Sequence, residues 1–353
     1  MNTATSTRLR KLTESRLLFP LLALALILLF DLFFVPGFFN ITSRGGDLHG
    51  SLVDILRNGS CVMLLAIGMT FVIATGGVDL SVGAVMAIAA SVAAVMINPD
   101  VVGKAIGAVD TDPNKTQVAL WAVFVVTLAV STLCGLWNGI LIAYGRIQAI
   151  MATLVLMIAG RGIAQLITNG VRIQIFYEPY KYIGTEWKIL PVSLYIVAGV
   201  YALAWLLTRR TAIGMFIESV GINSTSSYFS GINEKKIKVL AYAFCGFCAG
   251  VAGLVYSSNI ATSDANNTGL GFELDAILAV AIGGTLTTGG RFSLAGSIAG
   301  ALVMQATTTS ILALGVPAFA VQAIKGVVVV LVLLLYSEQF RAFVRKLTSQ
   351  AGA

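Results

Sequence analysis

The sequence predicts an all-α integral membrane protein with about ten transmembrane helices. Hydrophobic residues make up 57% of the 353 residues, charged residues make up 11%, and the mean hydropathy is +0.89. A soluble domain carries about 25% charged residues. Apolar runs recur from Leu17 to Leu335, and no polar block between them is large enough to fold alone. We therefore expect one membrane domain over residues 1–353 rather than two soluble domains.

The spans are predicted to be helices because the hydrocarbon of a membrane offers the backbone no hydrogen-bond partners. Backbone amides in hydrocarbon must bond within their own segment, so each span is expected to be a helix of about 20 residues, shorter where it is re-entrant or broken. The first span is longer than a signal core and contains Asp31, so we expect it to stay as a helix. The apolar runs predict ten helices, at residues 17–36, 51–75, 80–97, 117–143, 148–168, 190–208, 237–258, 274–290, 293–314 and 319–337.

Lysine and arginine predict the orientation, because short cytoplasmic loops are enriched in them. With the amino terminus inside, the larger basic set faces the cytoplasm: Arg8, Arg10, Lys11, Arg16, Arg146, Arg209, Arg210, Lys235, Lys236, Lys238, Arg291, Arg341, Arg345 and Lys346. The smaller set outside is Arg44, Lys104, Lys115, Arg172, Lys181 and Lys188. Both termini are then cytoplasmic, with tails at 1–16 and 338–353. This topology accounts for the net charge of +7 without a nucleic-acid partner.

A polar segment between two apolar runs, residues 209–232, is the most informative part of the chain. It contains several glycines and is flanked by basic residues, including Arg209, Arg210 and Lys235. Burial in a membrane requires no such segment. On the predicted orientation it lies in a cytoplasmic loop at 209–236, where we expect it to dock a cytosolic partner and to receive force from that partner.

Two segments of the chain, residues 76–88 and 270–282, resemble each other. In the predicted topology, the first lies at the inner end of the second and third helices and the second at the outer end of the seventh and eighth, which makes an inverted repeat. Such repeats in transporters bring glycine-broken helices together around a pathway, where carboxylates face water or protein. Residues 76–88 and 270–282 align without gaps, pairing Gly77 with Gly271, Asp79 with Glu273, Leu80 with Leu274, Ala87 with Ala281 and Ile88 with Ile282.

Four charged residues near these segments each have two interpretations. Asp79 and Asp275 line the pathway or cap the helices beside them, and the two roles are compatible. Arg161 and Lys325, inside the fifth and tenth helices, are either buried and paired with Asp79, Glu273 or Asp275, or they extend to the membrane surface.

The outer loop before the second repeat also has two interpretations. Residues 263–268 are a run of polar side chains around a single alanine, Ala265. The run is either a solvated turn or a contact to an extracytoplasmic partner.

The chain contains no motif for covalent chemistry. The phosphate-binding pattern of ATPases does not occur. Cys245 and Cys248 lie in mid-helix without a second pair, which favours packing over a redox or metal role. One histidine, His49, cannot form a histidine metal site. A membrane-embedded enzyme would need a nucleophile with a base, or a metal cluster, and the sequence suggests neither. We therefore expect no enzyme activity, metal or cofactor in this chain.

The ordered motifs along the chain resemble one family of membrane proteins. They are Ala66–Thr70 with Ala74–Ala84, Leu136–Gly139, Gly214–Asn223, Glu273–Ile277 and Gly289–Phe292. Together they resemble the permeases of ribose-type bacterial sugar ABC importers over nearly the whole chain. Residues 160–165 and 264–267 are most similar to the galactofuranose-importer permeases.

The resemblance implies a ten-helix permease of the inner membrane, usually paired in a dimer, that imports a monosaccharide such as galactofuranose or ribose by alternating access. A periplasmic sugar-binding protein would lie outside, and ATPase subunits holding ATP and Mg inside. The predicted pathway or gate residues are Asp79, Ser81, Asn138, Glu273 and Asp275. The resemblance places the coupling helix within 214–232, and the predicted ATPase-coupling residues are Gly214, Glu218, Gly221, Asn223, Ser230 and Gly231. The predicted binding-protein contacts are Asp264, Asn266 and Asn267.

One departure from the family pattern falls in the coupling loop. The family commonly has two alanines and a charged residue after the motif Gly-x-Asn, whereas this chain has Ser224–Ser227. Serine and threonine compete for backbone hydrogen bonds, so a weaker helix is expected there. Several alternatives stay open: the sugar, a homodimer or a heterodimer with a related chain, and an ion-coupled secondary transporter that uses Asp79 and Glu273.

Overall fold

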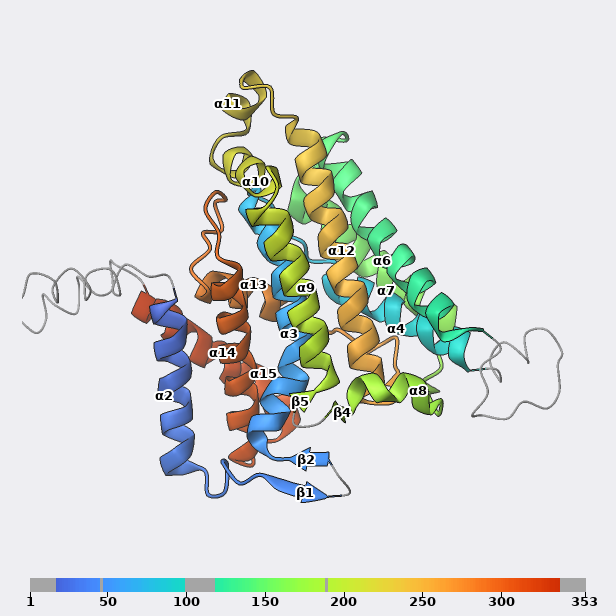
Figure 1. The fold of residues 1–353 in the computed structure, drawn as a ribbon, viewed down its shortest axis with the longest axis vertical. Helices are drawn as coiled ribbons and strands as arrows, with labels where there is room; N and C mark the ends of the chain where they lie inside the picture. The colour runs from blue at the N-terminus through green and yellow to red at the C-terminus, as the bar shows by residue number, and fades with distance from the viewer. Residues whose placement is uncertain (1–16, 45–46, 99–117, 188–189, 337–353) are drawn as a thin grey trace, which may run out of the picture.

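The computed structural model describes residues 17–44, 47–98, 118–187 and 190–336, in which the chain forms a helical bundle that narrows toward one end (Figure 1). The narrow end carries α10 (Ile213–Ile222) and α11 (Ser224–Phe229), and the hairpin of β1 (Thr42–Arg44) and β2 (Asp47–His49) lies at the other end. The predicted tails at 1–16 and 338–353 lie outside the described residues, as do Lys104, Lys115 and Lys188.

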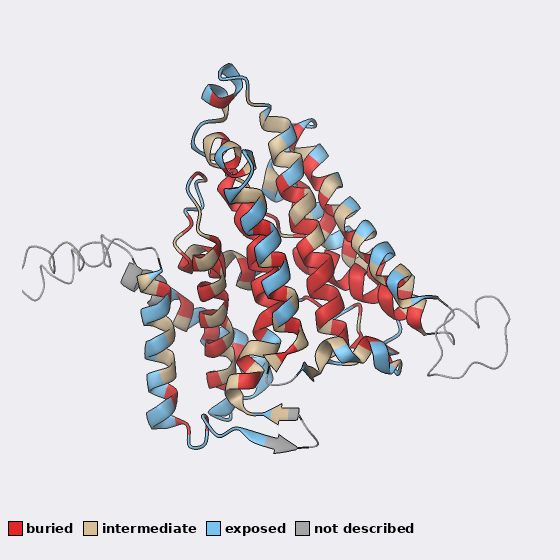
Figure 2. Cartoon of the chain, in the orientation of Figure 1, coloured by how far each residue is buried: buried red, intermediate tan, exposed pale blue. Residues whose placement is uncertain are grey.

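The helix α3 (Ser51–Ala74) forms the centre of the bundle, and Figure 2 shows buried residues along most of its length. Within an apolar stretch of 18 residues in each helix, 83% of the residues of α3 are buried, against 67% for α12 (Glu234–Asn259) and α14 (Leu294–Ala313). The corresponding share is 22% for α6 (Leu120–Ala143), α7 (Ala149–Thr168) and α9 (Val192–Arg209). The first three helices are therefore inner helices, and the last three have outward faces.

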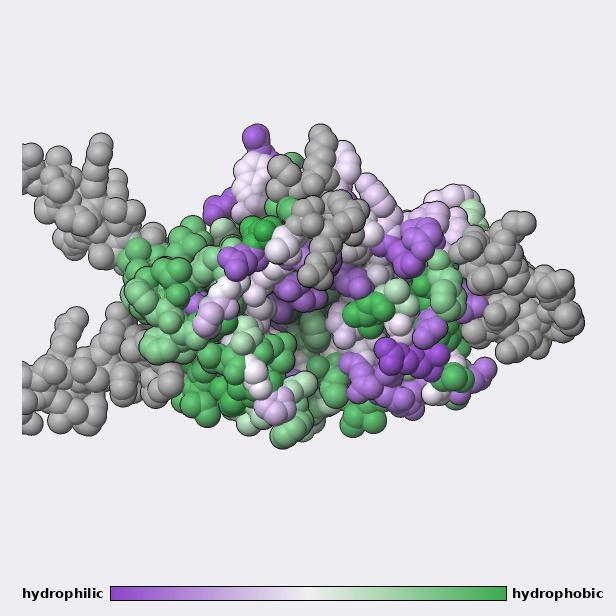
Figure 3. All heavy atoms as spheres, turned by 90° about the horizontal axis from the view of Figure 1, so that it is seen from below, coloured by the Kyte–Doolittle hydropathy of each residue, from purple (hydrophilic) through white to green (hydrophobic). Residues whose placement is uncertain are grey.

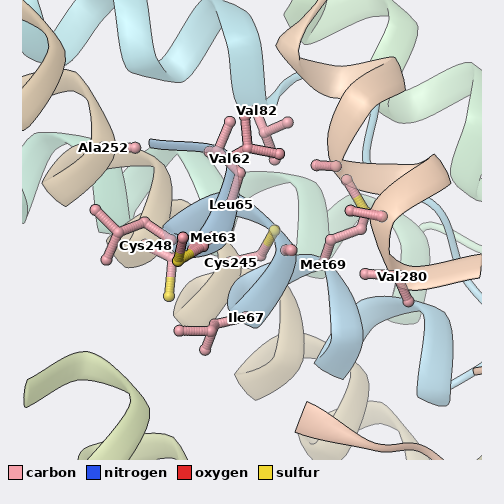
Figure 4. Packing of buried hydrophobic residues seen from close by; sticks show 14 of the residues in the cluster. Val62, Met63, Leu65, Ile67, Met69, Val82, Cys245, Cys248, Ala252 and Val280 are labelled. Atoms are coloured by element: carbon pink, nitrogen blue, oxygen red, sulfur yellow. The ribbon is translucent and has the colours of Figure 1, made fainter. Parts of the chain in front are cut away.

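Small residues let the inner helices approach closely. A Cβ placed on Gly246 of α12 would lie 2.5 Å from the Ser131 carbonyl oxygen of α6, so only glycine fits at this crossing. On the other side of α12, Cys245 and Cys248 pack against α3, where a Cβ on Gly68 would lie 2.9 Å from both residues. Figure 4 shows the two cysteines among the buried apolar side chains of the core. The packing role predicted for them is confirmed.

Each of the ten predicted ranges contains a helix. Six of these helices are long and apolar enough to cross a membrane: α3, α6, α7, α9, α12 and α14. The other four are not in this group of long apolar helices: α2 (Leu18–Phe34), α4 (Val82–Ile97), α13 (Phe272–Ile282) and α15 (Ala318–Tyr336). The all-α membrane class is confirmed for the described residues.

The eighth predicted range, 274–290, is wrong at its carboxyl end, because α13 stops at Ile282. Gly284 has φ +80°, its N–H donates to the Ala281 carbonyl, and the Thr285 N–H donates to the Val280 carbonyl. This bond pattern is the glycine-terminated helix end, which glycine favours because it lacks a Cβ. A loop at 283–293 follows and joins α13 to α14.

The sides of the bundle expose large apolar side chains. On α2 and α7 these include Leu26 at 60%, Phe33 at 74%, Ile158 at 71% and Leu166 at 78% exposure. Figure 3, which shows the end opposite α11, has polar side chains across its middle and apolar side chains around part of its edge. Apolar flanks with polar ends are the surface that a bilayer solvates.

The end near the hairpin is closed by short elements. They are α8 (Glu178–Lys181) with a 3₁₀ turn at Tyr182–Gly184, the pair β3 (Ile173–Gln174) and β6 (Thr262–Ser263), and the pair β4 (Glu186–Trp187) and β5 (Leu190–Pro191). An ion pair of 2.6 Å between Arg57 and the buried Glu186 fastens β4 to α3, and Glu186 also accepts the Leu48 N–H of β2. The sequence analysis missed this pair, whose partners lie 129 residues apart.

Candidate functional site

A connection at residues 75–81 leads from the end of α3 back into the bundle. The Gly76 N–H donates to the Ile73 carbonyl and the Gly77 N–H to the Val72 carbonyl, which ends α3. Two polar residues that follow are deeply buried, Asp79 at 1% and Ser81 at 0% exposure. The glycine pair of the first repeat thus breaks the helix and places a carboxylate inside the protein.

Three predicted pathway residues meet there in a buried polar cluster. The Ser81 backbone N–H and hydroxyl both donate to Asp79 Oδ1, at 2.9 Å and 2.6 Å. Asn138 of α6 donates from Nδ2 to the Ser81 hydroxyl at 2.9 Å, and its Oδ1 is buried without a hydrogen-bond partner. Asp79 therefore binds the residue just before α4 rather than an N–H group of its first turn.

The second repeat segment brings Glu273 to the start of α4. A Cβ on Gly83 of α4 would overlap the Gly269 carbonyl oxygen and Oε2 of Glu273, and a Cβ on Gly269 would overlap the Gly83 carbonyl oxygen. Glu273 also accepts the Gly271 N–H at 3.2 Å. The start of α4 therefore meets, backbone to backbone, the turn that precedes α13, one residue before the second aligned segment. Among the described residues, no hydrogen bond joins Glu273 to the Asp79 cluster.

Asp275 is paired with Lys325 of α15. Lys325 Nζ lies 2.6 Å from Asp275 Oδ2, the two side chains are 10% and 15% exposed, and Thr308 of α14 lies 3.4 Å from the ammonium group. The alternative in which Lys325 is buried and paired is confirmed. The capping alternative for Asp275 is wrong, because α13 begins at Phe272 and Asp275 lies within its first turn.

Arg161 of α7 binds the outer loop instead of a carboxylate. Its Nη1 donates to the backbone carbonyls of Ala265, at 3.1 Å, and Thr268. Two carbonyls of the segment that precedes α13 are thereby held against α7. No ion pair of Arg161 occurs among the described residues.

The three predicted binding-protein contacts form an internally bonded turn. Asp264 accepts the Asn266 N–H at 2.9 Å and the Asn267 side-chain amide at 2.8 Å. Gln165 of α7 donates to the Asn266 side chain at 2.6 Å. The hydrogen bond from Asn267 lowers the pKa of Asp264 below its ordinary value, so this carboxylate is ionised at neutral pH. Asn266 and Asn267 stay exposed, which leaves a polar surface at this turn.

The predicted coupling segment forms two helices, α10 and α11. Asn223 ends α10 and caps α11, because its Oδ1 accepts the Ser226 N–H at 2.9 Å. At the other end of α11, the Gly231 N–H donates to Tyr228 and the Ile232 N–H to Ser227. Gly231 has φ +82°, which suits glycine at this position. The serine-rich run is therefore helical, held by caps at both ends, and Ser230 precedes the terminating glycine.

A cavity of about 420 Å³ lies beside α10. Its lining includes Gly214 and Glu218 of α10, Arg209 at the end of α9, and Phe292 and Leu294 near the start of α14. Gly214 packs against α9, where a Cβ would lie 2.9 Å from the Thr208 Cα. Four of the six predicted coupling residues thus belong to α10 and its junction with α11, and the other two, Ser230 and Gly231, end α11.

Comparison with known proteins decides the family. The family described as the branched-chain amino acid transport system permease component matches residues 51–336. The chain belongs to this permease family. The match covers the Asp79 cluster, both repeat segments and the α10–α11 loop of the permease.

Three relatives are sugar permeases. The permease is 44% identical over 331 residues to the galactofuranose transporter permease of Escherichia coli K12, covering 94% of this chain and 92% of the relative. It is 37% identical over 330 residues to the fructose import permease of Bifidobacterium longum, covering 92% and 88%. It is 32% identical over 305 residues to the ribose import permease of E. coli K12, covering 85% and 87%. No solved structure gives a significant match.

The resemblance seen in the motifs is confirmed by these matches. The relatives are transport permeases rather than enzymes, which agrees with the prediction that the chain is not an enzyme. Together with the six apolar helices, the matches make the chain a multi-pass membrane protein. The sequence analysis missed Thr308 as a partner of Lys325, because threonine in a helix has many uses and carries no distinctive signal.

Proposed function

We propose that this permease is the membrane-spanning subunit of an ATP-driven importer that moves a monosaccharide into the cytoplasm by alternating access. The observation that carries the proposal is the 44% identity to a galactofuranose transporter permease over 94% of the chain. Galactofuranose is the first sugar to test, with ribose and fructose next, since the other relatives are named for those sugars.

The proposed topology has ten membrane-embedded helices, an inverted repeat and both termini in the cytoplasm. Two features of the fold support it. The short helices α4 and α13 begin beside the contact between Gly83 and Gly269. From there α4 ends beside β3, where Asn98 donates to the Gln174 carbonyl, and α13 ends before the loop that contacts α10. Discontinuous helices that meet in this way surround the substrate site in many transporters. The single domain over residues 1–353, with its two tails, is part of the same proposal.

Two groups of side chains are proposed for the pathway or its gate. The first is the buried cluster of Asp79, Ser81 and Asn138, whose unpartnered Asn138 Oδ1 is an unused hydrogen-bond acceptor. The second is Glu273 with Asp275 at the start of α13. In this conformation both groups are largely buried, which fits a closed pathway in which polar groups bind one another until a sugar hydroxyl competes for them.

The coupling partner is proposed to be a cytosolic ATPase subunit, which would hold ATP and Mg, while this chain holds no cofactor. The α10–α11 loop supports this role, because it exposes large apolar side chains at the narrow end of the bundle, away from the apolar sides that would face lipid. They are Met215 on α10 at 62%, and Tyr228 and Phe229 on α11 at 67% and 83%. Exposed aromatic side chains of this kind are enriched in protein interfaces.

The outer partners are proposed to be a periplasmic sugar-binding protein and a second permease chain. The turn at Asp264, Asn266 and Asn267 supports the first, since it presents a fixed polar surface. The second chain is either another copy or a related permease. Exposed apolar faces such as that of α7 suit either neighbouring helices or lipid.

The test is uptake of radiolabelled galactofuranose into proteoliposomes that hold this permease. Four preparations are compared: permease alone, permease with candidate ATPase, permease with ATPase and binding protein, and the full set without ATP. Uptake is expected only in the full set with ATP. A proton or sodium gradient imposed on the permease alone is the matched control.

Two outcomes decide between the transport classes. ATP-dependent uptake that needs both partners supports the importer. Uptake by the permease alone on an ion gradient would overturn it in favour of an ion-coupled secondary transporter, in which Asp79 and Glu273 would carry the ion.

A further inference from the structure

Three parts of the backbone meet at the carboxyl end of α3. The Ala74 carbonyl belongs to the last turn of α3, where carbonyls lack helical partners, and it accepts the Gly290 N–H of the 283–293 loop at 2.9 Å. A Cβ placed on Gly221 of α10 would overlap both this carbonyl oxygen and the Gly290 nitrogen. Gly221 therefore lies directly against the hydrogen bond that joins α3 to the loop.

The contacts extend to a second pair of glycines. A Cβ on Gly289 would lie 2.8 Å from the Gly221 carbonyl oxygen and 3.0 Å from the Gly76 nitrogen. We call Ala74, Gly76, Gly221, Gly289 and Gly290 the glycine junction. In it, α10, the end of α3 and the 283–293 loop touch through backbone atoms at Gly221 and Gly289, and the Ile222 side chain of α10 lies against Gly290.

The two segments that α10 touches lead to the two proposed pathway groups. From the glycine junction, the chain continues through 75–81 to Asp79 and the start of α4. The 283–293 loop follows α13, whose first turn carries Glu273 and Asp275. One turn of α10 is thus connected to both repeat segments, although the two segments are almost 200 residues apart in sequence.

Backbone contact of this kind transmits displacement well. A long side chain between two helices can change rotamer and absorb a small shift, whereas close-packed backbone atoms cannot move toward each other. At its other end α10 is packed on α9 through Gly214, so its two ends contact different parts of the bundle.

We propose that Gly221 is a positioning residue, through which movement of α10 is delivered to the end of α3 and to the 283–293 loop together. This inference rests on the proposed function, because it takes α10 as the element that a cytosolic ATPase moves. It adds a specific point of transmission and a specific consequence: both pathway groups shift in one step rather than in sequence.

The first experiment compares Gly221→Ala with wild type in the full reconstituted complex. The control variant is Gly199→Ala in α9, where a Cβ would meet nothing within 4 Å. Overpacking at the glycine junction is expected to reduce sugar transported per ATP hydrolysed by roughly tenfold, while the ATPase subunit still co-purifies and hydrolyses ATP. Gly199→Ala should match wild type in all three measurements.

A second measurement keeps the glycine junction intact, which covers the case in which Gly221→Ala does not assemble. Spin labels are placed at Met215→Cys and Leu286→Cys, both on exposed side chains, in a chain whose native cysteines are buried or half-buried. The distance between the labels is expected to stay the same with and without bound ATP, because α10 and the 283–293 loop move together. A label at Ile158→Cys of α7, an exposed side chain on a helix outside the glycine junction, should change its distance to both.

The outcomes separate this inference from the proposed function. If wild type needs ATP and both partners, but Gly221→Ala keeps the normal ratio of sugar to ATP, the inference is overturned and the importer stands. A change in the distance from Met215→Cys to Leu286→Cys on ATP binding would also overturn it. Uptake by the permease alone on an ion gradient would overturn the proposed importer function itself, whatever the result for Gly221→Ala.

Discussion

Acidic side chains inside the bundle each have a hydrogen-bond partner on the chain. Asp31 accepts the Ser310 hydroxyl at 2.7 Å, Asp79 accepts the Ser81 hydroxyl, and Asp275 pairs with Lys325. A carboxyl group in hydrocarbon is costly unless such a partner is present. Of these three acidic residues, Asp275 is the one with a cationic partner, and its pair with Lys325 links α13 to α15 near the second repeat segment.

The pair of Asp275 and Lys325 should be far more sensitive to loss of one partner than to loss of both. Lys325→Gln alone leaves a buried carboxylate without its cation, and we expect it to reduce the free energy of unfolding by about 3–5 kcal/mol. Asp275→Asn should act similarly. The double variant should cost less than the sum of the two. Thermal unfolding of the purified permease in detergent measures all three.

The matched control is the exposed pair of Lys181 and Glu178, which has the same separation of 2.6 Å but side chains 32% and 75% exposed. Lys181→Gln should change stability by at most about 1 kcal/mol. The interpretation of a buried, coupled pair fails if Lys325→Gln costs no more than this control.

At the scale of single elements, α11 depends on its ends. It has six residues, and isolated helices shorter than about 12–15 residues are marginal in water. Its outward side carries the exposed Tyr228 and Phe229, so burial adds little to its stability. The cap at Asn223 and the left-handed Gly231 are therefore the main local sources of order.

Asn223→Ala and Gly231→Ala should each unfold α11 without affecting the bundle. Loss of the N-cap costs about 0.5–2 kcal/mol, and a Cβ in the left-handed conformation costs about 1–2 kcal/mol. Hydrogen exchange should show faster exchange at residues 224–229 in both variants, with an unchanged melting temperature. The control is Thr225→Ala, since Thr225 is exposed and alanine favours a helix. Equal exchange in Asn223→Ala and the control would contradict this account of the caps.

The helices illustrate what sequence can predict and where it stops. The ten ranges are found because each needs a long apolar run, which is a local property of the chain. The end of α13 is missed because glycine and threonine, which fill most of residues 283–290, are also tolerated inside membrane helices. Only the bond pattern around Gly284 distinguishes a helix end from a tolerated glycine pair. Local composition therefore predicts that a helix is present more reliably than it predicts the residue at which the helix ends.

For the candidate site, sequence gives candidate residues but not which of them meet. The repeat predicts Asp79 and Glu273 as equivalent, yet Asp79 joins Ser81 and Asn138, while Glu273 lies against Gly83. The choice between pairing and surface exposure for Lys325 needs the position of α15 relative to α13, a contact between residues 50 apart. Arg161 binds backbone carbonyls, and because every residue has one, the sequence does not indicate which of them will be the partners.

At the scale of the whole molecule, the fold has two distinct ends. The α10–α11 loop lies at one end, and the β1–β2 hairpin lies at the other (Figure 1). The distribution of lysine and arginine predicts that the α10–α11 end is cytoplasmic. The glycine junction lies toward that end, so a force on α10 would reach the pathway from inside the cell, and a reversed orientation would place the loop where no ATPase is present.

The orientation is tested by labelling single cysteines with a membrane-impermeant maleimide. Phe229→Cys at the tip of α11 and His49→Cys in β2 are both exposed, and wild type is the background control because its cysteines are buried or half-buried. The permease is expressed without partner subunits, so no docked protein shields the tip. In right-side-out vesicles we expect labelling of His49→Cys only, and in inside-out vesicles of Phe229→Cys only. The reverse pattern would invert the topology and remove the route by which an ATPase could act on α10.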